Sequence, residues 1–428
     1  MALKRPLPAL MGGVSLSVLV SLGALAHQHL RTDALEQRLL REVNTLTHAE
    51  HPRPAHLTAT RPGTFGDALA PLLPKLLQRA RATPASSAAE AATLEAVTEG
   101  RAPVTDLPAS RLEALEQGLP LLRQVLAATH AESGGLPEDL RPLASPEVSR
   151  RDALLHALRH VVEDAALETR RLVSRGEADP AVDTCLDTLA LSRELALGGG
   201  LVGQRLSAAG YARMWRPCTD AIDAASTSRK RQAISQLTRL HEGIPPVSLT
   251  LHEESVAAQL HAFRDLLSED TRAALPPTWS DAPEQPSALS RRLQWRQWVE
   301  DADRLLAVAD QPAEERRRSL AALEAQKAGE YLRQAEAPSV RLSAEDLEAM
   351  ELRALRSEAL IALAEVDVAR AEKGQWPRAL PTRTTSLVLE PVDETRVSIR
   401  SCIQGLMSEP LVVKADSAPA LQQVHDVP

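Results

Sequence analysis

The chain has 428 residues, a formal net charge of −8 and only 2% aromatic residues. This length is enough for about two or three domains of ordinary size. Ala, Leu, Glu, Arg and Gln dominate and β-branched residues are sparse, which favours a mainly α-helical fold. The negative charge argues against general nucleic-acid binding, because phosphates require a basic face.

An uncharged apolar run occupies residues 6–26, directly after Lys4 and Arg5. A helix needs about 20 apolar residues to cross a bilayer, so residues 1–30 predict either a retained membrane anchor or a signal peptide cleaved near Ala26. We expect a single-pass inner-membrane protein with its bulk in the periplasm. The alternative is a soluble periplasmic protein.

Residues 31–48 predict a stalk helix that continues the membrane segment outward. Prolines interrupt residues 49–64, which therefore predict a linker. The stalk prediction depends on apolar residues that recur at helical spacing on one face, namely Leu35, Leu39, Val43 and Leu46.

Residues 65–373 predict a helical body arranged as an irregular array of antiparallel helices. Capping boxes, in which two side chains satisfy free backbone N–H groups, are expected at Ser110–Glu113 and Ser343–Asp346. Apolar periodicity and helix breakers place the helices at about 65–83, 86–99, 110–133, 145–175, 180–197, 201–225, 227–242, 250–273, 287–309, 312–336 and 343–374.

The C-terminal region changes character at Gly374. Residues 386–390, 395–400 and 410–414 alternate or are β-branched, which predicts a hairpin or a three-stranded sheet within residues 374–415. The tail at 416–428 is expected to be disordered.

His156, His160 and Glu163 could share one helix face and hold a metal. That face lies opposite the apolar stripe containing Leu154, and no fourth ligand is near, so a solvent-exposed face is the favoured interpretation. His252 and the following glutamate lack the second histidine of a zinc protease motif.

Residues 198–203 have glycine spacing that superficially resembles a phosphate-binding loop. Gln204 and Arg205 replace the required Lys and Ser/Thr, and a helix precedes the loop instead of a strand. We interpret the glycines as a break between two helices. No Gly-x-Ser-x-Gly motif is present, and we predict no catalytic, cofactor-binding or metal-binding residue.

Basic and aromatic residues alternate over residues 291–298. Such a pattern is found on helices that bind nucleic acid or a membrane surface, and a partner or membrane contact is favoured over nucleic acid here because of the export signal. However, Trp295, Trp298, Ala302 and Leu305 also form a helical stripe, and buried packing is the favoured interpretation.

Cys185 and Cys218 lie on the two helices that flank Gly199. A simple antiparallel hairpin misaligns them by about five residues, roughly 7 Å along the helix, so the sequence leaves their bridging open. A bridge would stabilise the fold by about 3–4 kcal/mol and would leave Cys402 unpaired.

The segment 354–377 is an Ala/Leu-rich helix that leads into Gly374-Gln-Trp376-Pro377 and a small sheet. This segment resembles the body of pilins and secretion pseudopilins, and membrane-anchored helical envelope proteins of GC-rich Gram-negative bacteria. In a pilin, this helix continues from the N-terminal membrane segment, whereas here more than 300 residues intervene. The chain is therefore not a pilin.

The resemblance implies an accessory protein of type IV pilus assembly or a related export system, with other cell-envelope proteins as partners. We expect a non-catalytic interaction or scaffold protein. The alternatives are a periplasmic enzyme, with His156 and His160 as candidates, and a ligand-binding helical module with a pocket between residues 145–225 and 287–336.

Overall fold

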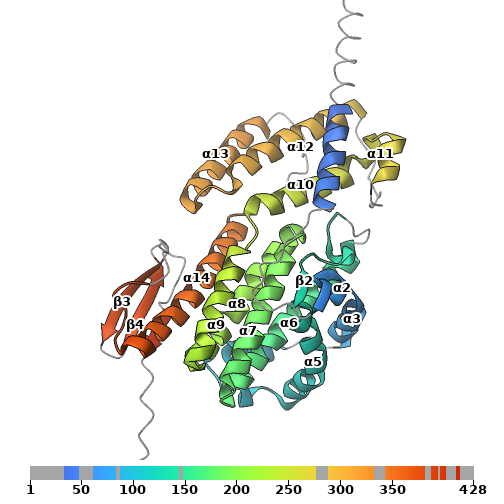
Figure 1. Cartoon of the computed structure of the whole chain (residues 1–428). Helices are drawn as coiled ribbons and strands as arrows, with labels where there is room; N and C mark the ends of the chain where they lie inside the picture. Colours follow the sequence, from blue (N-terminus) through green and yellow to red (C-terminus); the bar gives the residue numbers. More distant parts are fainter. Residues whose placement is uncertain are drawn as a thin grey trace, which may run out of the picture.

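Long antiparallel helices make up most of the molecule (Figure 1), which confirms the predicted mainly α-helical fold. The computed structural model describes residues 33–47, 61–82, 87–143, 148–275, 288–331, 343–380, 387–393, 396–401 and 411–414.

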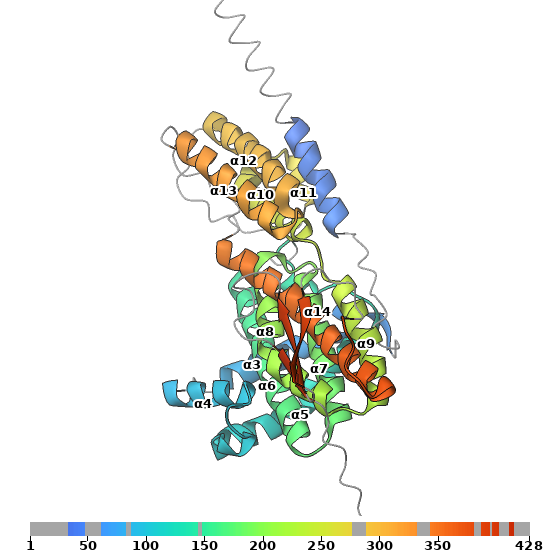
Figure 2. The ribbon, with the colours of Figure 1, turned by 90° about the vertical axis from the view of Figure 1, so that its left-hand side faces the viewer.

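Five long helices form the main bundle. Consecutive helices α6 (Val148–Ser174), α7 (Ala178–Ala196), α8 (Gly200–Ala224) and α9 (Thr227–Glu242) run up and down through short turns. The late helix α14 (Ala344–Lys373) returns to pack against α8 and α9, and it lies in front of them in Figure 2. Elements far apart in the sequence therefore share one core.

Elements from the N-terminal half pack beside this bundle, mainly against α6. The predicted helix over 65–83 is divided, because Pro71 and Pro74 lack backbone N–H donors and fall at the junctions between its parts. The elements are β1 (Arg61–Thr64), α2 (Phe65–Leu69), η1 (Ala70–Leu72), α3 (Leu73–Ala82), α4 (Ala88–Thr98), η2 (Val104–Asp106), α5 (Ala109–Ala128), β2 (Ala131–Ser133) and η3 (Glu138–Leu140), with β1 and β2 paired in parallel.

The capping box predicted at Ser110–Glu113 is absent from helix α5. The helix begins at Ala109 after Pro108, with no side-chain capping bond, so Ser110 lies inside the first turn and the predicted box is not formed. The second box is confirmed: Asp346 N donates to Ser343 Oγ at 3.0 Å, and Asp346 Oδ2 accepts from Ser343 N at 3.1 Å.

A second set of helices, the upper group, lies above the main bundle in Figure 1. It has its own apolar core, in which Phe263 and Trp295 are buried. The group consists of the helix over residues 33–47 together with α10 (Val247–Phe263), η4 (Arg264–Leu266), α11 (Glu269–Ala274), α12 (Ala288–Ala309) and α13 (Ala313–Tyr331).

The helix over residues 33–47 is part of this upper group and does not stand free as the predicted stalk. Leu39 is 1% exposed and Val43 is 2% exposed, and both belong to the upper core. Glu36 accepts a hydrogen bond from Ser268 N at 3.1 Å. The stalk prediction is wrong because the apolar stripe that indicates a helix also needs a packing partner, and α10 and α12 provide one.

The C-terminal strands form the predicted small sheet. β3 (Leu387–Asp393), β4 (Arg396–Ser401) and β5 (Leu411–Lys414) are antiparallel in the order β3-β4-β5. The sheet packs on α14, where Val397 and Ile399 enter the main core. It is therefore continuous with the helical body.

The end of α14 has the predicted geometry. Gly374 closes the helix with a φ of 68°, a left-handed conformation that glycine adopts without a steric penalty. The guanidinium of Arg370 lies 4.2 Å from the ring centroid of Trp376, which holds the chain against the helix as it turns toward the sheet.

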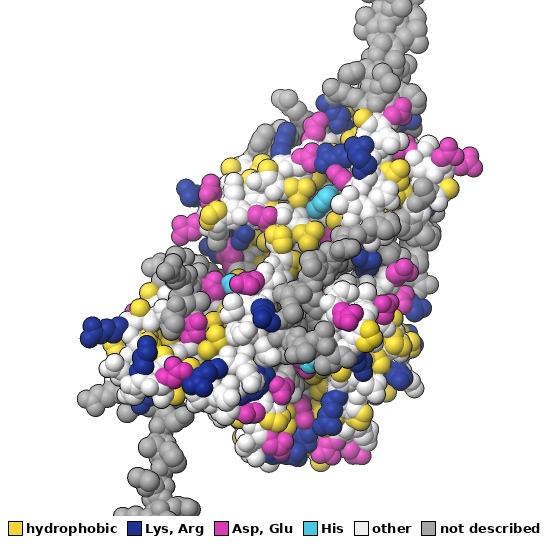
Figure 3. All heavy atoms as spheres, viewed as in Figure 1, with side chains coloured by type: hydrophobic (Ala, Val, Ile, Leu, Met, Phe, Trp, Pro, Cys, Tyr) yellow, Lys and Arg dark blue, Asp and Glu magenta, His cyan; other side chains and the backbone are white. Residues whose placement is uncertain are grey.

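Several predictions fall outside the described residues. These are the apolar run at 6–26, most of the linker, Cys402 and the tail at 416–428. None of the helices within the described ranges is long and apolar enough to cross a membrane. On the face shown in Figure 3, basic and acidic side chains are interspersed.

Candidate functional site

Helices α7 and α8 approach closely because glycines face α7. A Cβ on Gly210 would lie 2.2 Å from Ser192 Oγ, and a Cβ on Gly203 would lie 2.1 Å from the carbonyl oxygen of Leu195. A side chain at Gly203 would clash with the backbone of α7 and force the helices apart, and one at Gly210 would displace the side chain of Ser192. These glycines therefore fix the spacing around which the candidate site is built.

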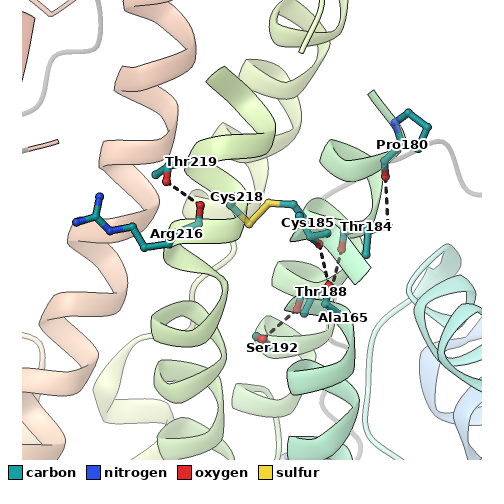
Figure 4. Close-up of a disulfide and its surroundings, with 10 residues drawn as sticks. Ala165, Pro180, Thr184, Cys185, Thr188, Ser192, Arg216, Cys218 and Thr219 are labelled. Atoms are coloured by element: carbon teal, nitrogen blue, oxygen red, sulfur yellow. Dashed lines mark hydrogen bonds between the residues drawn. A yellow bond between two sulfur atoms is a disulfide. The ribbon is translucent and has the colours of Figure 1, made fainter. Parts of the chain in front are cut away.

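A disulfide joins these helices between Cys185 and Cys218 (Figure 4). Both cysteines are fully buried, and their Cα atoms are 5.5 Å apart. The helices are staggered, so that Gly210 faces Ser192 and Cys218 faces Cys185. This stagger removes the misalignment that a symmetrical hairpin around Gly199 would impose.

Hydroxyl groups along α7 are satisfied within the helix. Thr184, Thr188 and Ser192 each donate to the carbonyl four residues earlier, at 3.1, 2.7 and 2.9 Å (Figure 4). These bonds let polar residues occupy a buried helix contact without leaving donors unpaired.

A pocket of about 210 Å³ opens between α6, α7 and α8. Its rim is charged, with Arg159 and Glu163 from α6 and Arg213 from α8. The rest of the lining is apolar and comprises Val162, Leu195, Leu206, Ala209 and Gly210. This pocket lies within the first of the two segments, 145–225 and 287–336, between which a pocket is expected from the sequence.

Glu163 interacts with the neighbouring charged and titratable side chains at the rim of the pocket. Its carboxylate lies 3.0 Å from His160 Nδ1 and 3.3 Å from Arg159 Nε. Burial alone would raise the pKa of Glu163, but the hydrogen bond with His160 and the charges of His160, Arg159 and Arg213 outweigh burial and lower it. Glu163 is therefore ionised at neutral pH and paired.

The two candidate histidines lie beside this rim. His156 is exposed, and its ring meets that of His160 edge-on at 4.8 Å. Although the residue is exposed, partial desolvation of its ring, followed by the charges of His160 and Arg159, lowers the pKa of His156. Among the described residues, no group of three or more His, Cys, Asp or Glu side chains could hold a metal ion.

The glycine run contains the helix break that the sequence predicts, since α7 ends at Ala196 and α8 begins at Gly200. Two carboxylates of α10 occupy the start of α8. Gly200 N donates to Glu253, and Leu201 N donates to Glu254 Oε2 at 3.1 Å. A helix N-terminus attracts anions, and here acidic side chains fill the position that a phosphate would take.

Glu253 is a functional candidate that the sequence does not single out. It is 4% exposed, and its Oε2 has no hydrogen-bond partner among the described residues. Burial raises its pKa to about 7, although the bond from Gly200 and the charges of Arg141 and His252 act in the opposite direction. The sequence carries no signal of this burial, because Gly200 and Arg141, which act on the carboxyl group, are distant from it in the sequence.

Arg353 of α14 is a second buried group outside the sequence predictions. It donates to Gln204 Oε1 and to Ser207 Oγ, the latter at 3.0 Å. Burial lowers its pKa to about 10, while the nearby Tyr211 acts to raise it. No described carboxylate forms an ion pair with Arg353, so neutral oxygens solvate this charge at the contact between α8 and α14.

The tryptophans of α12 are packing residues, as the favoured interpretation states. Trp295 is fully buried and stacks on Phe263 with ring centroids 5.6 Å apart. Its indole N–H donates to Gln259 Oε1 at 3.1 Å. Trp298 is also buried, so neither ring is free to contact a membrane or partner.

We compared the chain with protein-family models, curated proteins and solved structures, and none of the three comparisons gave a match.

Proposed function

We propose that this chain is a non-catalytic interaction protein of the cell envelope, anchored in the inner membrane through residues 6–26 with its helical body in the periplasm. The buried bridge between Cys185 and Cys218 carries the proposal. Disulfides persist in oxidising compartments such as the periplasm and are rare in the cytosol. The apolar run supports the same location.

The position of the helix over residues 33–47 supports a fixed attachment of the body to the anchor. Six residues, 27–32, separate the end of the apolar run from the start of this helix at Asp33, whose packed face places Leu39 in the upper core. Six residues span at most about 20 Å. In this arrangement the upper group lies next to the membrane and the main bundle extends away from it.

The nature of the partners is inferred from the surface and the C-terminal segment. Interspersed charges (Figure 3) suit contacts with proteins better than contacts with a polyanion. The resemblance of residues 354–377 to pilins favours the machinery of type IV pilus assembly or a related export system. Normal pili, secretion and surface motility after deletion of the gene would contradict this assignment.

Cell fractionation tests the location. We expect the full chain to remain with inner membranes after a carbonate wash, and a variant lacking residues 6–26 to be soluble in the cytoplasm. The variant is the matched control, because it retains every described residue. Recovery of the full chain in the cytosol would contradict an envelope protein, and its release with the periplasm would replace the anchor with a cleaved signal.

A further inference from the structure

We propose that the pocket between α6, α7 and α8 binds a monocarboxylate carried by a small apolar group. The carboxylate would contact Arg213, and the apolar group would contact the apolar lining formed by Val162, Leu195 and Leu206. This site does not depend on the envelope location, because its geometry is the same in any compartment.

The charges at the rim favour an anion. Arg159 and His160 are already engaged with Glu163. Arg213 influences Glu163 electrostatically but forms no ion pair within 4 Å with a carboxylate in the described ranges. Its guanidinium therefore has donors available, and a carboxylate is the group that matches the guanidinium in two parallel hydrogen bonds.

The same rim disfavours a doubly charged ligand. Glu163 is ionised and borders the pocket beside Arg213. The charged lining residues are Arg159, Arg213 and Glu163, so the pocket carries about one net positive charge for a ligand to neutralise. A phosphate dianion would carry an uncompensated charge next to Glu163, whereas a carboxylate would not.

The volume limits the apolar part of the ligand. Benzene fits a cavity of about 150 Å³, and pockets for drug-sized ligands measure about 300–1,000 Å³. A pocket of about 210 Å³ therefore accommodates a group the size of one leucine or phenylalanine side chain. Such a group can belong to a free acid or to the C-terminal residue of a polypeptide, and both present the same chemistry.

Calorimetric titration of the purified full-length protein tests the site with 4-methylpentanoate as the probe and 4-methylpentanamide as its neutral counterpart. We expect the acid to bind at least about tenfold more tightly than the amide, because a charge-assisted hydrogen bond contributes about 1.5–3 kcal/mol. Equal affinity of the acid and the amide would overturn the proposal.

Two variants locate the binding site. Arg213→Gln should weaken binding of the acid at least about tenfold, and Ala209→Phe should abolish it by filling the pocket. Arg123→Gln and Ala212→Phe are the matched controls, since both residues are exposed and neither lines the pocket. Ala209 is exposed and Arg213 is partly exposed, so circular dichroism should show native folding.

A second pair of probes distinguishes the sources of the carboxylate. N-acetyl-Ala-Ala-Leu with a free C-terminus would bind in place of the acid if the ligand is a polypeptide end, and its C-terminal amide would not. Binding of the free acid alone would identify a small molecule. Failure of both the acid and the peptide to bind, or unchanged binding by Arg213→Gln, would overturn the proposed site.

Discussion

Buried charged side chains join helices that are distant in the sequence. Lys230 Nζ of α9 lies 2.7 Å from Asp367 Oδ2 of α14, and the same ammonium donates to the carbonyl of Asp223 at 2.8 Å. Both charged side chains are buried. A buried ion pair is no more stabilising than two well-packed apolar side chains in the same place. Removing one member of the pair, however, leaves the other as an uncompensated buried charge, which is strongly destabilising.

Asp367→Asn should therefore destabilise the protein by about 3–5 kcal/mol. The double variant Lys230→Met/Asp367→Leu removes both charges and should recover most of that loss. Urea unfolding of the wild type and both variants measures the difference. If Asp367→Asn were as stable as the wild type, the burial of the Lys230 ammonium would not require the Asp367 carboxylate.

Glu253 should make stability depend on pH. Its pKa is raised from 4.5 in the unfolded chain to about 7 in the folded protein, because burial disfavours its charged form. Between these values the folded state holds a proton that the unfolded chain releases. The contribution of Glu253 is thus fully present below about pH 4.5 and is lost as the pH rises through about 7.

Glu253→Gln should consequently be more stable than the wild type at pH 8, by on the order of 3 kcal/mol, and similar to it at pH 5. The glutamine can still accept the hydrogen bond from Gly200. Urea unfolding at the two pH values gives the comparison, with Glu254→Gln as a neighbouring control. Equal stability of Glu253→Gln and the wild type at both pH values would exclude a buried, protonated Glu253.

At the scale of elements, local patterns predicted most helices and the C-terminal strands, because caps, breakers and apolar periodicity act over a few residues. Ser343 and Gly374 mark the two ends of α14 as the sequence predicts. Packing partners could not be predicted in this way. The stripe containing Leu39 indicated a helix, but nothing local indicated that it would share an apolar core with Trp295.

The candidate site shows the same limit. The sequence placed His160 and Glu163 on one face of α6, and the structure confirms that they are in contact. Arg213 completes the rim from α8, and its position depends on the close approach of the helices at Gly210. Tertiary packing sets this approach, so no local sequence pattern could predict the pocket.

Packing of the helix over residues 33–47 can be tested directly. Leu39→Ala should cost about 2–5 kcal/mol of local stability, because it removes a buried side chain from the upper core. Proteolysis at Arg38 or Arg41 should accelerate, and amide hydrogen exchange across this helix should increase. The exposed Thr45→Ala is the control, and equal cleavage rates in the two variants would argue against a packed helix.

At the scale of the whole molecule, two helical groups share one chain but have separate apolar cores. Their contacts are partly polar: Gln204 Nε2 donates to Thr250 Oγ1 at 2.6 Å, and Arg316 of α13 pairs with Glu351 of α14 at 2.8 Å. The disulfide lies inside the main bundle, so it stabilises that bundle and does not join the two groups.

Removing the bridge with Cys185→Ala/Cys218→Ala should lower the free energy of unfolding by about 3–4 kcal/mol, because the unfolded chain loses a covalent constraint over 33 residues. Urea unfolding with and without reductant provides the measurement. The reductant should destabilise the wild type and leave the double variant unchanged. A reductant effect of equal size in both proteins would show that the bridge does not stabilise the fold.

The redox state of Cys185 and Cys218 in intact cells tests the envelope assignment most directly. In a Cys402→Ser background, intact cells are quenched in acid to stop thiol exchange, the protein is denatured, and free thiols are then labelled with a maleimide at neutral pH. Cys185→Ala provides a free Cys218 as the positive control. We predict that the pair is protected until a reductant is added. Labelling of both cysteines without reductant would contradict an oxidising compartment and, with it, the proposed location.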